Sequence, residues 1–161
     1  MSDNFKKITL NKNFYEFLIR DAYLYACHKD IEAIKPGNVN INSPHHDTTA
    51  SDYLISSINS GSELFNDSYS LGDRILSAIV ATKKETQMNT NLGIILLCAP
   101  IAHALLNYKE MSLKEAIAKT IDSATADDTV KICEAINIAN PGGLGNVSDY
   151  DTKSMPVVKL R

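Results

Sequence analysis

The sequence predicts an all-α protein, a helical bundle of about six helices with long polar loops on one side. Two observations lead to this fold class. Apolar residues recur at spacings of three and four in almost every periodic segment, as on one face of a helix, and no stretch of useful length alternates in the way a strand requires. With 161 residues, of which 44% are hydrophobic, the chain is expected to form a single domain, 1–161.

The first helix is predicted over about 13–33, and it is followed by a long loop. Its apolar residues repeat with helical spacing, and it ends before Pro36 because the residue before a proline avoids the helical region. The loop, 35–48, is rich in turn residues. A second helix begins at Thr49, with Asp52 near its positive N-terminal end, and Gly61 lies near its end. The third helix is predicted over about 71–84.

The fourth helix is predicted to begin at a cap formed by Thr90 or Asn91 and to run to about residue 108. It is apolar nearly all round, so we expect it to be central, with a kink at Pro100. Ser112-Leu113-Lys114-Glu115 is a capping box that starts the fifth helix. Thr125 to Asp128 is a similar start for the sixth helix, which stops at 140–143; no period is evident in 144–161.

Composition and charge exclude several classes of protein. The net charge of −3 argues against non-specific nucleic-acid binding. We expect no signal peptide, because the chain does not open on a positive region followed by an apolar one, and the longest apolar run, 92–106, is too short to span a bilayer. The three cysteines, Cys27, Cys98 and Cys133, lack metal or redox spacing. We expect them to be reduced and buried, and the protein to be cytoplasmic.

Two polar motifs carry the chemistry of the chain. In Lys35-Pro36-Gly37-Asn38, lysine suits phosphate and glycine allows close approach of a ligand, although the same residues form an ordinary turn. His46-Asp47 follows; histidine and carboxylate together bind metals or transfer protons, and a solvated polar loop is the alternative.

The second motif, Asn89-Thr90-Asn91-Leu92-Gly93, starts the apolar helix, where free N–H groups favour an anion; simple capping is the alternative. Asp127 and Asp128 also stand at a helix start, where one of them is explained by capping and the other is a candidate metal ligand.

These segments, in this order, resemble the triphosphoribosyl-dephospho-coenzyme A synthase family. Where the lyase-associated members carry His-Lys, this chain has Asn91-Leu92, so it is similar to an asparagine-leucine sister branch of that family. Members are longer, so we expect the chain to correspond to their N-terminal portion and to be incomplete at its C-terminus. The resemblance rests on the following residues: Glu32, Lys35-Pro36-Gly37-Asn38-Val39, His46-Asp47, Asp52, Ser56, Gly72, Thr82, Asn89-Thr90, Gly93, the run 96–102, Asp128 and Pro141-Gly142-Gly143.

The resemblance implies an all-α transferase that takes ATP, displaces adenine and passes the triphosphoribosyl group to a dephospho-coenzyme A-like acceptor. It implies ATP as substrate and Mg²⁺ as the accompanying ion. Asp47 and Asp128 would be the catalytic carboxylates and the magnesium ligands. The substrate-binding residues would be Lys35, Asn38, His46, Asn89, Thr90 and Asn91.

Two other functions remain open at this stage. His28, His46-Asp47 and Asp128 occur in the order used by HD-type metal-dependent phosphohydrolases, although that family places its His-Asp pair on a helix. Alternatively, the chain is a non-catalytic binding or assembly module. Its apolar tail, 157–160, would then be covered by a partner. A homo-oligomer that covers this tail is an expectation, with a small nucleotide as the other partner and neither nucleic acid nor membrane.

Overall fold

The computed structural model describes residues 12–44, 47–145, 149, 151–154 and 158–160. Within these residues the protein consists of six α-helices and one short 3₁₀ turn, without a strand, so the predicted all-α class is confirmed. The elements in chain order are α1 (Lys12–Glu32), α2 (Ala50–Leu64), α3 (Leu71–Thr86), α4 (Leu92–Asn107), α5 (Leu113–Ser123), α6 (Ala126–Ala139) and η1 (Thr152–Ser154).

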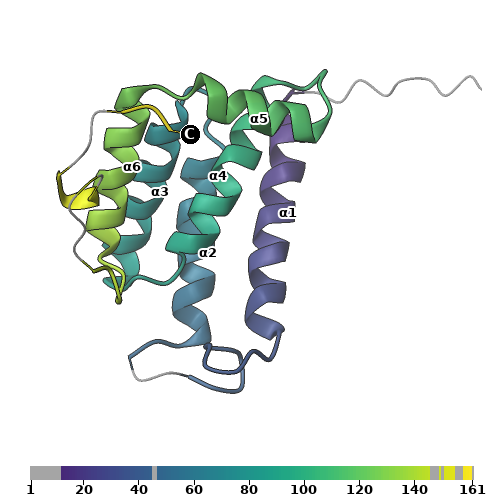
Figure 1. The fold of residues 1–161 in the computed structure, drawn as a ribbon. Coiled ribbons are helices and arrows are strands. Elements are labelled where there is room, and N and C mark those ends of the chain that lie inside the picture. Colours follow the sequence, from purple (N-terminus) through teal and green to yellow (C-terminus); the bar gives the residue numbers. More distant parts are fainter. Residues whose placement is uncertain (1–11, 45–46, 146–148, 150, 155–157, 161) are drawn as a thin grey trace, which may run out of the picture.

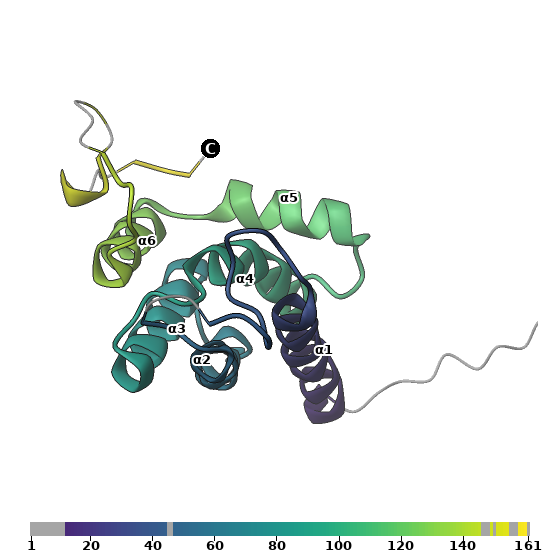
Figure 2. The same cartoon turned by 90° about the horizontal axis from the view of Figure 1, so that it is seen from below.

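The first four helices run alternately down and up the bundle (Figure 1). The turn from α1 to α2 and the turn from α3 to α4 therefore lie at the same end, called here the loop end. The turn from α2 to α3 and the start of α6 lie at the other end, called here the cap end. α5 crosses α4 on the outside, α6 packs on α3, and α1 stands beside α2 and α4 (Figure 2).

The predicted central place of α4 is confirmed by its contacts with α1, α2, α3 and α5. Ile95 and Ala99 of this helix are fully buried. Burial is incomplete, however, because Leu97 is 68% exposed. The helix continues through Pro100, which removes one backbone donor without ending it. None of the described helices is both long and apolar enough to cross a membrane.

Several helix starts follow the sequence signals. Ser112 and Glu115 form the predicted reciprocal capping box of α5, and Thr125 and Asp128 form that of α6. A third box, between Ser70 and Asp73, starts α3 and was not predicted. Because each box satisfies backbone N–H groups that have no partner inside the helix, these starts are encoded locally.

Candidate functional site

A polar pocket of about 380 Å³ opens at the loop end of the bundle. It lies between the C-terminal end of α1, the loop that follows, the first turn of α2 and the start of α4. The size is in the range of about 300–1,000 Å³ that is typical of small-molecule sites. Its lining residues are Asp30, Ile31, Lys35, Asn38, Val39, Tyr53, Thr90, Asn91, Gly93 and Ile94.

The Lys35-Pro36-Gly37-Asn38 motif is a tight turn that delivers two side chains to the pocket. The Asn38 N–H donates to the Lys35 carbonyl oxygen at 3.1 Å, and Gly37 adopts a positive φ of 79°. Proline followed by a glycine of positive φ is the pattern of a type II turn. The turn interpretation is therefore confirmed, and it does not exclude binding, since Lys35 and Asn38 both line the pocket.

Lys35 is held by a carboxylate of α1. Its Nζ lies 2.6 Å from Asp30 Oδ1, and both side chains are partly exposed. Asp30 also lines the pocket, although it was not among the predicted site residues. By contrast, Glu32, which belongs to the family-like motif, turns to His28 and Lys29 on its own helix. Among the described residues, the charged lining of the pocket is therefore one cation paired with one anion, so a phosphate must compete with Asp30 for Lys35 or bring its own cation.

Asn91 occupies the N-cap position of α4, but its side chain makes no capping bond. Its Nδ2 instead donates to Ser60 Oγ of α2 at 3.1 Å, and the Leu92 N–H is met by Asn89 Oδ1 at 3.4 Å. Asn91 is only 4% exposed. Capping of α4 therefore does not explain Asn91, because the backbone N–H of Leu92 is bonded by Asn89 instead.

The direction of the hydrogen bonds beneath the pocket follows from counting hydrogens. Ser60 donates its single hydroxyl hydrogen to the Ser56 carbonyl oxygen at 2.7 Å, so Ser60 Oγ must accept from Tyr23 at 2.8 Å as well as from Asn91. Burial, the largest cause, raises the pKa of the Tyr23 phenol above its ordinary value, which keeps Tyr23 protonated as a donor. Asn91 is thereby fixed with Nδ2 towards Ser60, and its Oδ1 has no partner among the described residues.

The same count of hydrogens decides which hydroxyl donates in the hydrogen bond between Ser56 and Thr90. Ser56 donates its hydroxyl hydrogen to the Asp52 carbonyl oxygen at 2.6 Å, so the 2.5 Å contact between the Ser56 and Thr90 hydroxyls has Thr90 as donor. The hydrogen of Thr90 is used inside the protein, and only lone pairs remain for a ligand. Beneath the pocket, the orientations of Thr90 and Asn91 are thus set by Ser56 and Ser60, which lie about two and three turns along α2.

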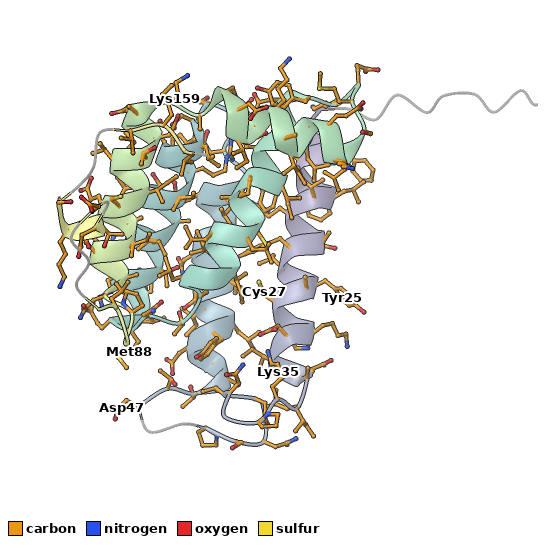
Figure 3. The ribbon with its side chains drawn as sticks, in the orientation of Figure 1. Tyr25, Cys27, Lys35, Asp47, Met88 and Lys159 are labelled. Atoms are coloured by element: carbon orange, nitrogen blue, oxygen red, sulfur yellow. The ribbon has the colours of Figure 1, made fainter. Side chains whose placement is uncertain are left out.

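The pocket unites four of the six predicted substrate-binding residues, Lys35, Asn38, Thr90 and Asn91. Asn89 does not line it and borders a separate small void with Thr82 and Met88. His46 lies outside the described residues. Asp47 is exposed on the loop and does not line the pocket, and Figure 3 shows it well apart from Lys35.

Asp128 lies at the cap end and serves the fold. Its Oδ1 accepts from the Gly72 N–H at 2.8 Å, and its Oδ2 accepts from the Thr125 N–H and hydroxyl, each at 2.8 Å. Burial alone would raise the pKa of this carboxyl, but hydrogen bonds from Ser70, Thr125 and Gly72 lower it to about 2. The neighbouring Asp127 pairs with Lys131, which also bridges to Asp73 of α3, with both contacts at 2.7 Å.

The predicted magnesium ligands Asp47 and Asp128 lie far apart: Asp47 is on the loop between α1 and α2, and Asp128 is in the first turn of α6, and these two elements lie at opposite ends of the bundle (Figure 1). The HD-type set is also not assembled, since His28 is at the loop end of α1, where it pairs with Glu32 at 3.0 Å, and Asp128 is at the cap end. Among the described residues no three His, Cys, Asp or Glu side chains form a metal-binding group. Among the described residues that line the pocket, Asp30 is the single carboxylate, so these residues do not form a preformed magnesium site.

The cysteines are free thiols. Cys27 and Cys133 are buried as predicted, whereas Cys98 is only partly buried. Burial raises the pKa of Cys27 to about 11, which leaves this thiol protonated and unreactive at neutral pH.

Comparison with known proteins gave one match. The model of the ATP:dephospho-CoA triphosphoribosyl transferase family matches residues 16–159. Neither the curated proteins nor the solved structures gave a match.

Proposed function

Because the chain belongs to the ATP:dephospho-CoA triphosphoribosyl transferase family, we propose that its loop-end pocket binds ATP for transfer of the triphosphoribosyl group to a dephospho-CoA-like acceptor. The observation that carries the proposal is the convergence of Lys35, Asn38, Thr90 and Asn91, which are more than 50 positions apart at the extremes, on one pocket. Nothing in the helical core requires these polar groups to meet there. Asp47 and Asn89, which stand near the pocket in sequence but do not line it, are secondary candidates.

The reaction would break the bond between C1′ of the ATP ribose and adenine, with the electron pair leaving on the base. A hydroxyl oxygen of the acceptor would form the new bond to C1′, and its proton would pass to adenine, so charge is balanced. Positive charge develops on the ribose as adenine leaves. Asp30 lines the pocket and would be the carboxylate that opposes that charge, in the manner of electrostatic stabilisation, in place of the expected Asp47 and Asp128.

Lys35 would bind the phosphates once it exchanges its Asp30 partner for them. Asn38, at the other end of the same turn, can donate and accept hydrogen bonds. Magnesium would enter with ATP, because the phosphates themselves supply oxygen ligands. Asn91 and Thr90, which are buried and bonded to Ser60 and Ser56, would hold the start of α4 in place beneath the nucleotide.

The test combines ligand-induced stabilisation with product analysis. Millimolar ATP with Mg²⁺ should raise the melting temperature, and ATP with dephospho-CoA should release adenine, measured by chromatography. Lys35→Met should weaken ATP binding about tenfold, on the order of 1.4 kcal/mol. Lys114→Met, which changes an exposed lysine of α5, should leave ATP binding unchanged.

The absence of both a thermal shift and adenine release in the natural chain would overturn the proposal. A loss of binding that is equal in Lys35→Met and Lys114→Met would show that only net charge matters, and not the pocket.

A further inference from the structure

A second, apolar cavity lies between α1 and α4. Its volume is about 230 Å³, below the range of about 300–1,000 Å³ for a site that holds a whole drug-sized ligand. Its walls carry almost no polar surface. This α1–α4 groove is lined by Ile19, Ala22, Tyr23 and Ala26 of α1, by Phe65, and by Cys98, Ile101, Ala102 and Leu105 of α4.

The groove and the polar pocket lie along the same faces of α1 and α4. On α1 the lining passes from Asp30 of the pocket to Ala26, Ala22 and Ile19 of the groove. These spacings of four and three residues keep to one helix face. The face of α4 does the same, from Ile94 of the pocket to Cys98, Ile101 and Leu105. The two helices run in opposite directions (Figure 1), so both rows lead from the pocket towards the cap end.

The dimensions favour a slender chain. From Cys98 to Leu105, the part of α4 that lines the groove, the helix rises about 10 Å at 1.5 Å per residue, roughly the span of three residues of extended chain. Alanines at positions 22, 26 and 102 leave the space. The aromatic rings of Tyr23 and Phe65, whose centroids are 5.8 Å apart, wall the groove on the side of α2. A cavity this small takes an arm of a ligand more readily than a helix of a second copy.

We propose that the α1–α4 groove holds the uncharged, partly apolar pantetheine arm of the acceptor while the reacting ribose of the acceptor meets ATP at the polar pocket. The inference rests on the proposed function for the identity of the acceptor. The chemistry of the acceptor fits this arrangement. Its long, uncharged arm is attached to a charged nucleotide end, and along α1 and α4 the apolar groove likewise follows the polar pocket. The half-open groove leaves the amides of the arm in contact with water.

The test compares an acceptor that has the arm with one that lacks it. Calorimetry on the natural chain should give at least tenfold tighter binding of dephospho-CoA than of ADP. Ala26→Phe fills the groove from an exposed position, so the fold should tolerate it; it should abolish this preference while leaving the ADP and Mg-ATP affinities unchanged. Ala118→Phe, at an exposed position of α5, is the matched control and should leave the preference intact.

Equal affinities for dephospho-CoA and ADP in the natural chain would overturn the inference, whatever Ala26→Phe does. A dimer of the natural chain in sedimentation that Ala26→Phe converts to a monomer without weakening dephospho-CoA would also overturn it, because the groove would then be an interface between copies. A preference for the arm without any binding of ATP would leave the inference standing and count against the proposed function.

Discussion

The two ends of the bundle both bury polar side chains, but they use them differently. At the cap end, Asp128 has both oxygens engaged by donors of α3 and α6. Arg74, which is fully buried, donates to the Leu64 and Tyr69 carbonyl oxygens where α2 ends. At the loop end, Ser60 and Ser56 donate their hydroxyl hydrogens to carbonyl oxygens of their own helix, and Asn91 Oδ1 has no partner among the described residues. Buried polar groups that satisfy one another support the fold. Asn91 Oδ1 differs from the other buried atoms without a partner, such as Arg74 Nε and Thr82 Oγ1, because Asn91 lines the polar pocket.

The largest effect is expected at the cap end from Gly72→Ala. A Cβ at this position would lie 2.6 Å from Asp128 Cα and 2.8 Å from the Asp128 carbonyl oxygen, and backbone atoms of a packed helix yield little. We expect a loss of about 3 kcal/mol in the free energy of unfolding, measured by urea denaturation.

The matched control is Gly93→Ala at the loop end, where nothing lies within 4 Å of the added Cβ. Because alanine favours a helix over glycine, this variant should be unchanged or about 0.5 kcal/mol more stable. Equal stability of Gly72→Ala and the natural chain would show that α3 and α6 do not pack as closely as described.

The next effect is the acid sensitivity of the cap end. The pKa of Asp128 is lowered to about 2 in the folded protein, against an ordinary value near 3.9 in the unfolded chain. A lowered folded-state pKa stabilises the protein above the unfolded pKa. That contribution, on the order of 2 kcal/mol, should disappear as the pH falls from about 4 to about 2.

Urea denaturation between pH 2 and pH 6 measures this change. Other carboxyl groups with a lowered pKa, among them Asp73 and Glu115, add to the total, so the comparison is with Asp128→Asn. The free-energy gap between the natural chain and this variant should shrink by about 2 kcal/mol as the pH falls. A gap that stays constant with pH would contradict the assigned role of the carboxylate.

The contrast between the two ends also explains what the sequence could predict. The capping boxes at Ser112 and Thr125 were found because their signal lies within four residues. Asp128 was interpreted as a metal ligand because a carboxylate at a helix start is compatible with either role. The deciding contact, with Gly72, joins positions that are 56 residues apart, and no local rule reports it.

The same limit applies to the candidate site. The turn at Lys35 to Asn38 could be read directly, since proline and glycine dictate its geometry. Asp30 was missed because a polar residue near the end of an amphipathic helix usually faces water. Asn91 was predicted as a site residue. That its side chain bonds Ser60 of α2 instead of capping α4 could not be predicted, because Ser60 belongs to another helix. The buried charge of Arg74 had no sequence signal either.

The smallest effect in this series tests the fixed polarity of the loop end through Asn91→Asp. Ser60 has no hydrogen to give, because its hydroxyl donates to Ser56, and a carboxylate cannot donate to Ser60 Oγ in place of the amide. We expect a loss of about 1–2 kcal/mol at neutral pH, the usual penalty for a buried hydrogen bond left unmade, measured by urea denaturation.

The pH dependence of this variant should run opposite to that of Asp128. Burial without donors raises the pKa of a carboxyl group, so the new group binds a proton more readily in the folded than in the unfolded chain. The penalty is present above the folded pKa and shrinks as the pH falls, because the protonated acid can donate to Ser60. Asn89→Asp makes the same change at an exposed position beside the start of α4, where the helix dipole favours negative charge. It should therefore be neutral or slightly stabilising, and an equal loss in both variants would mean that Ser60 does not fix the orientation of Asn91.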